Sequence, residues 1–335
     1  MLKIFKCSTG KYLKGEALSS WCYRLCQFPE VQQHLMEHFW KGSNQCPLFL
    51  SLFEFDQHLE TGSDLDFVSP NQLGAVLKSV IGNDLEKFSK PTGHVSPIIP
   101  WVYRRSYCQS CMVEAMRYTR APILKCVWRQ VLEPFCAVHN TLLWDAPRHV
   151  SDALDAPRAI FKWHHSVQAR ELRYEDYVND WSCLLQAACR VQKKFVKLRK
   201  SQGAGGAYLI DNTLMCLMRV LLTPGTVLYG HAGSRRLLDI KSTEGETLYV
   251  SCYLQPFRAS AACRARALFF IGVLIGWIGR REATASLKND YWAPSTPDQV
   301  WRSVYEFDPK IFSWLCENLR RFETRALLIP SSNIV

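Results

Sequence analysis

Residues 107–139 read YCQSCMVEAMRYTRAPILKCVWRQVLEPFCAVH. This stretch holds a Cys-x-x-Cys pair, Cys108 and Cys111, and a Cys-x-x-His pair, Cys136 and His139. Each pair can place two ligands on one tight turn, and the intervening segment can bring the second pair across to the first. We therefore predict that these four residues bind one zinc ion. Because four protein ligands leave no open coordination position, the expected role of this zinc is structural.

The alternative interpretation is two unrelated pairs of reduced thiols and a surface histidine. A single Cys-x-x-Cys is common, whereas two pairs with this ligand set favour a metal. Cys126 lies between the pairs. It is either a spare ligand or a small apolar side chain of the core, and we expect the core position.

Residues 1–100, before this module, are predicted to form a helical domain. Apolar residues recur at helical spacing along one face of residues 18–26 and of residues 73–81. The second helix follows a Ser-Pro pair and ends at Gly82-Asn83, and a further helix begins at once. Ser69–Phe88 thus has the outline of a helix-turn-helix, although an ordinary helical hairpin has the same outline.

Residues 101–150 are the predicted zinc-binding module, and residues 151–335 a C-terminal helical domain, so the fold class is mainly α. Trp181–Leu198 traces one apolar face of a long helix, whereas 247–254 has the composition of a strand. The other face of the long helix is basic, and we expect it to contact nucleic acid or a partner, or else to be a solvated surface. Its cations are Arg190, Lys193, Lys194, Lys197, Arg199 and Lys200.

The composition indicates a folded protein with an excess of positive charge. The 335 residues include 41 Lys and Arg against 30 Asp and Glu, a net charge of +11, which favours polyanionic partners. The longest apolar run, 267–279, is too short for a bilayer, which needs about 20 residues, and is predicted to be a buried helix. We expect no secretory signal and no membrane contact, so the 14 Cys are read as reduced thiols and metal ligands in the cytoplasm.

Several short motifs, taken together, resemble one protein family. The resemblance is to the TniQ family, in which G-E-S-L-S-S-W-x-x-R-L precedes L-P-W, R-Y-C-P-x-C, W-R and C-x-x-H-x-x-x-L. Order and spacing agree over about residues 11–144, and the C-terminal half shows no matching motif. The matching segments here are Gly15–Leu25 (GEALSSWCYRL), Ile99–Trp101 (IPW), Arg105–Cys111 (RSYCQSC), Trp128-Arg129 and Cys136–Leu143 (CAVHNTLL).

The chain departs from the family pattern at two places. Many members carry a second Cys pair soon after the His-x-x-x-Leu segment, whereas Trp144-Asp145 follows here and the next cysteine is Cys183. We therefore predict one zinc rather than two. Asn140 stands where the family usually has a glycine, directly after the ligand histidine.

The resemblance implies a non-catalytic adaptor that selects the target site in DNA transposition in the bacterial cytoplasm. Such proteins recruit an AAA+ ATPase regulator, which brings in the transposase. Some, often as homodimers, dock on a guide-RNA surveillance complex of the Cascade type. Others, the TnsD type, read an attachment-site DNA directly. Chain length favours the first kind. An alternative from another class is a zinc-containing transcription regulator that binds DNA.

The sequence does not favour an enzyme. Ser8–Lys11 and Gly203–Gly206 lack the spacing of nucleotide-binding loops. The adjacent His164 and His165 point to different faces of a helix, so a core or solvated role is expected rather than metal binding. No carboxylate spacing suggests two-metal nuclease chemistry, although such clusters can assemble from distant positions.

Overall fold

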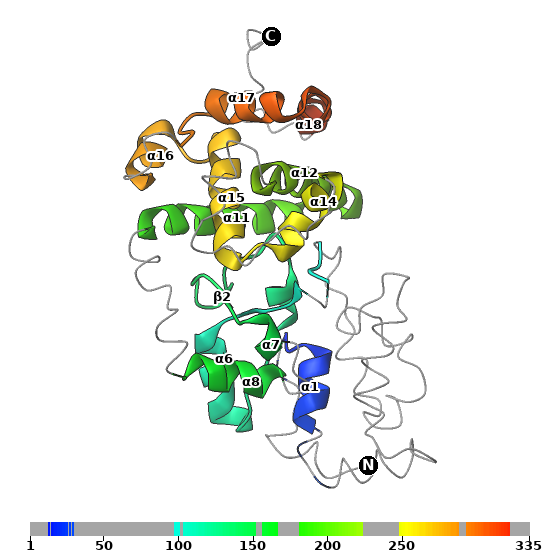
Figure 1. The fold of residues 1–335 in the computed structure, drawn as a ribbon, viewed down its shortest axis with the longest axis vertical. Coiled ribbons are helices and arrows are strands. Elements are labelled where there is room, and N and C mark those ends of the chain that lie inside the picture. The colour runs from blue at the N-terminus through cyan, green and yellow to red at the C-terminus, as the bar shows by residue number, and fades with distance from the viewer. Residues whose placement is uncertain are drawn as a thin grey trace. The chain divides into compact units, whose positions relative to one another are not determined.

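The computed structural model describes Leu13, residues 15–25, Gln27, Pro29 and residues 97–100, 103–151, 156–166, 181–223, 248–287 and 293–321. This part of the chain is mainly helical, as predicted (Figure 1). The expected helix-turn-helix at 69–88 lies outside it, and the domain boundaries at residues 100 and 150 stay predictions. Contacts divide the chain into two compact units, Met1–Val95, Tyr107–Arg129 and Ala146–Glu171 in the first, and Ser96–Ser106, Gln130–Asp145 and Leu172–Val335 in the second.

The first unit is built from short helices around large buried side chains. Its helices are α1 (Leu18–Leu25), α6 (Gln109–Thr119), the 3₁₀ turn η4 (Cys126–Arg129), α7 (Arg148–Ser151) and α8 (Ala156–His164). Helix α8 packs on α6 and α7. The core is aromatic and aliphatic, which stabilises a unit of this size by removing apolar surface from water. It includes Trp21, Tyr107, Met112, Trp128 and Ile160.

The second unit is a helical assembly around one buried helix. Its helices are α11 (Ser182–Ser201), α12 (Ala204–Leu222), α14 (Leu248–Arg258), α15 (Ala261–Leu274), α16 (Arg280–Ser286), α17 (Pro297–Phe307) and α18 (Pro309–Arg321). Figure 1 shows α15 running across α11, and α15 also packs on α12 and α17. The short strands β1 (Ser106–Tyr107) and β2 (Trp144–Asp145) form a two-stranded sheet.

Helix α15 explains the longest apolar run of the sequence. Every residue of α15 is buried, so residues 267–274 of the run lie in the core helix that we expected, whereas 275–279 follow the end of the helix and Gly276 and Gly279 are exposed. The close approach of α11 requires Gly272, because a Cβ there would lie 2.5 Å from Cγ2 of Val191. The Ser260 side chain accepts a hydrogen bond of 3.2 Å from Cys263 N and caps the helix. None of the helices in the described part of the chain is long and apolar enough to cross a membrane.

One prediction of secondary structure was wrong. Residues 247–254 were expected to form a strand from their β-branched and aromatic residues, yet Leu248–Arg258 is helix α14. This helix packs on α12 and buries Gln255 completely. Strand propensity is a weak preference that depends on the surrounding packing, and here the helical contacts outweigh it.

Candidate metal centre

The first pair of predicted ligands lies at the start of α6. Cys108 is the residue before the helix, in extended backbone conformation (φ −109°, ψ 115°). Met112 N donates a hydrogen bond of 3.1 Å to Cys108 O, which closes the first helical turn. Cys111 is therefore three residues along the same turn, on the same side as Cys108. Both cysteines are buried.

The second pair lies on a tight turn that the backbone closes twice. Asn140 N donates to Cys136 O at 2.8 Å, and Cys136 N donates to Thr141 O at 2.9 Å. Asn140 has a positive φ of 57°, in the left-handed region where glycine and, among other residues, asparagine are tolerated. The family's usual glycine at this position fits the same backbone conformation. The turn places Sγ of Cys136 3.7 Å from Nδ1 of His139.

The four predicted residues come together. One ligand atom from each of Cys108, Cys111, Cys136 and His139 lies within 4.8 Å of all the others, with the cysteines buried and the histidine partly exposed. Ligands about 2.1 to 2.3 Å from a tetrahedral zinc are roughly 3.5 to 3.8 Å apart, so the Sγ–Nδ1 distance is near the expected value. Three thiolates and one imidazole are typical of closed zinc sites. The cluster is compatible with a structural zinc site.

A cation lies beside one of the sulfur ligands. Lys125 Nζ donates a hydrogen bond of 3.3 Å to Sγ of Cys111. Three thiolates around a divalent zinc would carry a net charge of −1, which an ammonium beside a ligand sulfur stabilises. Cys126, the next residue, is not in the cluster, and its Sγ lies 3.8 Å from Glu16 O. It is only partly buried, so it lies at the edge of the core and not fully within it as we expected.

The opening motif of the chain packs against the segment that carries Lys125. Ala17 N donates to Leu124 O at 2.8 Å, Cys126 N donates to Gly15 O at 3.1 Å, and Glu16 pairs with Lys125 as an isolated antiparallel bridge. Gly15 has a φ of +75°, which an L side chain rarely adopts. The residues that carry the family resemblance at the N-terminus are therefore folding residues of the first unit.

Charged side chains buried within this packing were not singled out from the sequence. Glu16 and Arg24 form a buried ion pair, with Arg24 Nη2 2.7 Å from Glu16 Oε2 and Nε 3.1 Å from Oε1. Burial raises the pKa of Glu16, and its hydrogen bonds to Arg24 oppose that rise. Glu16 lies before the first residue of α1 and Arg24 lies in its last turn, so no spacing within one helix links them, and only their shared membership of the opening motif was a signal.

In place of a second Cys pair, Asp145 joins three segments of the second unit. Its Oδ1 accepts a hydrogen bond of 2.6 Å from the Ser106 hydroxyl, and its Oδ2 accepts one of 2.7 Å from Ala261 N at the start of α15. Arg264 Nη2 donates to the same Ser106 hydroxyl at 2.9 Å. Burial lowers the pKa of Arg264 to about 10, and Asp145 opposes that shift. A polar network thus ties strands β1 and β2 to α15.

The six predicted cations of α11 have different environments. Arg199 is mostly buried and paired with the carboxylates of Glu133 and, at 3.5 Å, Asp211. Arg190 pairs with Glu282 at the surface, and Lys194 Nζ lies 5.4 Å from the centroid of the Trp277 ring. Three more are exposed and lie at i, i+4 and i+7 along one face of the helix, namely Lys193, Lys197 and Lys200.

These three lysines line one cavity together with the ligand turn. The cavity has a volume of about 310 Å³, and Cys136, Ala137 and Asn140 form part of its wall. The only acid among the described residues that line it is Glu133, whose charge Arg199 offsets. Arg199 is therefore a mostly buried, paired residue, whereas Lys193, Lys197 and Lys200 form an exposed cationic strip.

The adjacent histidines have the non-ligand positions that the sequence suggested. Nδ1 of His164 is 2.7 Å from the hydroxyl of Tyr107 in the core of the first unit, and His165 is exposed. Neither belongs to a metal-binding group among the residues whose positions the structure gives.

Comparison with known proteins gives no relative. No family model matches the chain, and no curated protein or solved structure matches it either.

Proposed function

We propose that this chain is a target-selecting adaptor of the TniQ type in DNA transposition, in which Cys108, Cys111, Cys136 and His139 hold one structural zinc ion. The observation that carries the proposal is the pairing of residues 15–17 with residues 124–126 in the first unit. Beside this pairing, two of the segments that resemble the family are in direct contact, because Arg129 Nη2 donates a hydrogen bond of 3.1 Å to the Ser19 hydroxyl. Two motifs 110 positions apart in the sequence therefore pack in one unit. Chance similarity of two short motifs gives no reason for such packing.

The zinc would have a structural role and would take no part in catalysis. The cluster offers three thiolates and one imidazole, which saturate a tetrahedral ion and leave no position for water or a substrate. Binding energy of the metal would hold the short helix start at Cys108 and the turn at Cys136 in place. The adaptor function then lies in binding surfaces, with an AAA+ ATPase regulator on one side and a guide-RNA surveillance complex on the other.

Co-purification tests this function. The tagged chain is recovered from cells that carry its own gene neighbourhood, with and without nuclease, and the bound proteins and nucleic acids are identified. Nuclease-resistant recovery of an ATPase regulator with guide-RNA complex subunits is the expected result. Recovery of neither the regulator nor a transposase contradicts the proposal.

A matched pair of cysteine variants sharpens this experiment. Cys108→Ser removes a proposed ligand, whereas Cys183→Ser changes an exposed cysteine on α11. Loss of the regulator with the first variant and retention with the second would assign the recruitment to the folded metal module. If both variants retain the regulator equally, recruitment of the regulator does not depend on the metal.

The second candidate is direct reading of attachment-site DNA, which the strip of Lys193, Lys197 and Lys200 favours. Three exposed cations along one helix face can each neutralise a phosphate and release a counterion. If the chain reads DNA directly, the ATPase regulator co-purifies with DNA and without guide-RNA complex subunits. A transcription regulator without transposon partners would instead bind DNA and recover neither protein.

Salt dependence measures the contribution of the lysine strip. Duplex DNA binding is titrated from 50 to 200 mM salt for the wild type and for a triple Lys→Ser variant at 193, 197 and 200. The slope of log K against log salt is negative, and each lost phosphate contact makes it shallower by about 0.9. The slope of the triple variant should therefore be shallower than that of the wild type by roughly 2.7. The control is a triple Arg→Ser variant at the exposed Arg280, Arg281 and Arg302, which removes equal charge elsewhere. Equal slopes for both variants would exclude the strip as the DNA contact.

A further inference from the structure

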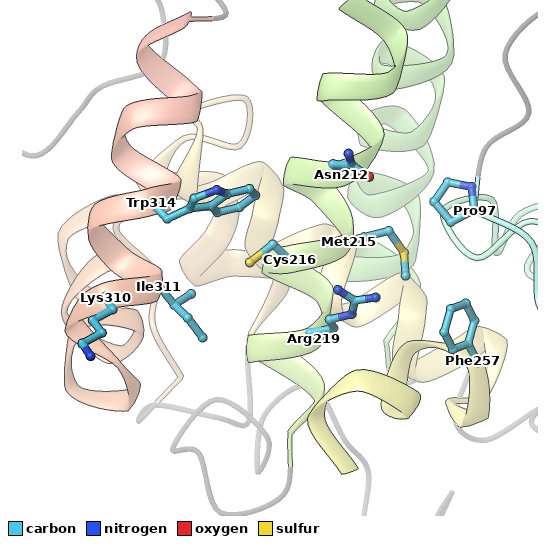
Figure 2. A pocket seen from close by; sticks show the side chains of 9 residues that line it. All are labelled: Pro97, Asn212, Met215, Cys216, Arg219, Phe257, Lys310, Ile311 and Trp314. Carbon is cyan, nitrogen blue, oxygen red and sulfur yellow. The ribbon is translucent and has the colours of Figure 1, made fainter. Parts of the chain in front are cut away.

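The second unit contains a cavity that the proposed function does not use. Its volume is about 500 Å³, within the range of ligand sites. Four lining residues come from α12 and three from α18, with Phe257 of α14 and Pro97 completing the wall (Figure 2). The seven helical residues are Asn212, Met215, Cys216 and Arg219 from α12 and Lys310, Ile311 and Trp314 from α18.

Much of the wall is apolar. Figure 2 shows the side chains of Ile311 and Trp314 directed from α18 toward α12, with Phe257 on the other side of Arg219. Trp314 keeps 41% of its surface exposed, which is large for an indole beside a cavity. Aromatic and aliphatic walls bind the flat or branched body of an organic ligand by removing apolar surface from water.

Arg219 is the polar centre of the cavity. Its guanidinium carbon lies 4.3 Å from the centroid of the Tyr253 ring, a cation–π contact that fixes the plane of the group. Its Nε is buried and has no hydrogen-bond partner among the described residues. A buried donor without an acceptor costs free energy, and a turn of the side chain that brought Nε to a ligand oxygen would recover that cost.

The remaining polar groups also suit an anion. None of the described residues that line the cavity is acidic. Asn212 lies seven residues before Arg219 on the same face of α12, roughly 10 Å along the helix, so its amide can contact the body of a ligand rather than the anion on Arg219. Burial raises the pKa of the Cys216 thiol to about 11, so this side chain is neutral near pH 7 and does not act as a nucleophile. The cavity is therefore built to bind rather than to react.

We propose that this cavity binds a carboxylate or phosphate carried on an aromatic or aliphatic body, with the anion on Arg219 and the body against Ile311 and Trp314. Such a group could belong to a free organic anion or to an acidic, aromatic segment of a partner protein. The proposal stands independently of a role in transposition. Lys310 is a bystander, because Figure 2 shows its side chain directed away from Arg219.

Two fluorescent probes with a shared aromatic body test the anion site. 1-Anilinonaphthalene-8-sulfonate carries an anion, and N-phenyl-1-naphthylamine is its neutral counterpart. Both are titrated into the full chain. Arg219→Met keeps an apolar stem of similar shape and removes the guanidinium, so it should weaken sulfonate binding about tenfold or more, since a charge-assisted hydrogen bond is lost. The neutral probe should change by less than about twofold, as should sulfonate binding by Lys310→Met.

Equal sulfonate affinity of the wild type and Arg219→Met would overturn the proposal. So would a larger loss with Lys310→Met. If Arg219→Met lacks the circular dichroism spectrum of the wild type, Arg219→Lys replaces it in the comparison. This variant keeps the charge but not the planar fork, so affinity should fall only about threefold, and an unchanged affinity contradicts the role of Arg219.

Competition then separates the two sources of the ligand. Phenyl phosphate and the peptide N-acetyl-Glu-Trp-Glu-amide are each added to the sulfonate complex. Displacement by phenyl phosphate alone would indicate a free organic anion, and displacement by the peptide would indicate a partner segment. Displacement by neither at millimolar concentration would exclude the proposed ligand class.

Discussion

The carboxylate of Glu16 accepts two hydrogen bonds from the guanidinium of Arg24, and both side chains are almost completely buried, at 0% and 1% exposed. The bidentate geometry is the strongest form of this interaction. Leu13 N also donates to Oε2 of Glu16 at 3.0 Å, so the pair holds the chain just before α1. The Glu16–Arg24 ion pair therefore holds the opening motif in the conformation in which it packs on residues 124–126.

Removing one partner of this pair should cost far more than removing both. Arg24→Met leaves a buried carboxylate without its cation, and we expect a loss of about 3 to 5 kcal/mol in the free energy of unfolding. The double variant Glu16→Gln, Arg24→Met should recover a large part of that loss because no buried charge remains. Urea denaturation of the two single variants, Arg24→Met and Glu16→Gln, and of the double variant measures this difference. Additive losses in the double variant would contradict a coupled pair.

The two positive-φ residues near the candidate metal centre should respond in opposite ways to substitution. Gly15→Ala is expected to lose about 1 kcal/mol, since a Cβ at φ +75° is strained although nothing lies within 4 Å of it. Asn140→Gly should be neutral or slightly stabilising, because glycine adopts the left-handed conformation more readily. Thermal unfolding gives both values, and a clear loss with Asn140→Gly would contradict the backbone explanation of the family's glycine.

Purified protein should contain one zinc per chain. We expect Cys108→Ser and Cys136→Ser to lose the metal, and Cys126→Ser and Cys183→Ser to retain it, because only the first two lie in the cluster. Elemental analysis by mass spectrometry measures the content. A chain without zinc in all forms, or zinc retained by Cys108→Ser, would contradict the proposed site.

Arg199 should contribute to stability, and the lysines of the same helix should not. Arg199→Met removes the cation between Glu133 and Asp211, which lie in mostly buried positions, and we expect a loss of about 2 to 4 kcal/mol. Lys197→Met is the matched control on the exposed face, with an expected change within about 0.5 kcal/mol. Chemical denaturation compares the two. Equal effects would remove the distinction between a structural and a surface cation.

The Cys216 thiol should be slow to alkylate. With its pKa raised from 9.0 to about 11 by burial, its thiolate fraction at pH 8 is about 100-fold below that of an ordinary thiol. The alkylation rate should therefore keep rising tenfold per pH unit beyond pH 9. Iodoacetamide labelling at several pH values, with mass spectrometry of the peptides, measures this rate. A plateau near pH 9 would contradict the raised pKa.

The raised pKa of Cys216 also makes the free energy of unfolding depend on pH. Between pH 9 and about 11 the unfolded chain loses the Cys216 proton while the folded chain keeps it. The contribution of this thiol to the free energy of unfolding is therefore present below pH 9 and is lost as pH rises through the folded pKa. Cys216→Ala should flatten this part of the pH profile.

The sequence by itself predicted which four Cys and His residues come together, the helical class and the burial of α15. Cys-x-x-Cys and Cys-x-x-His are local patterns, and a helix start and a tight turn position their side chains with little help from distant residues. The apolar run 267–279 has 13 residues, too few for a bilayer, which favoured a buried helix, and its residues 267–274 lie in α15. Helical periodicity likewise predicted α11, which begins at Ser182.

Only the tertiary structure decided which charges of the basic stretch are buried, and that residues 248–254 are helix rather than strand. Arg199 and Lys197 are both cations of one basic stretch, yet one is paired with two carboxylates and the other is exposed. Segment 247–254 has strand composition and becomes helix because it packs on α12. The partners concerned are distant in sequence, as Glu133 is from Arg199, and no local pattern encodes a contact that the packing of several helices creates.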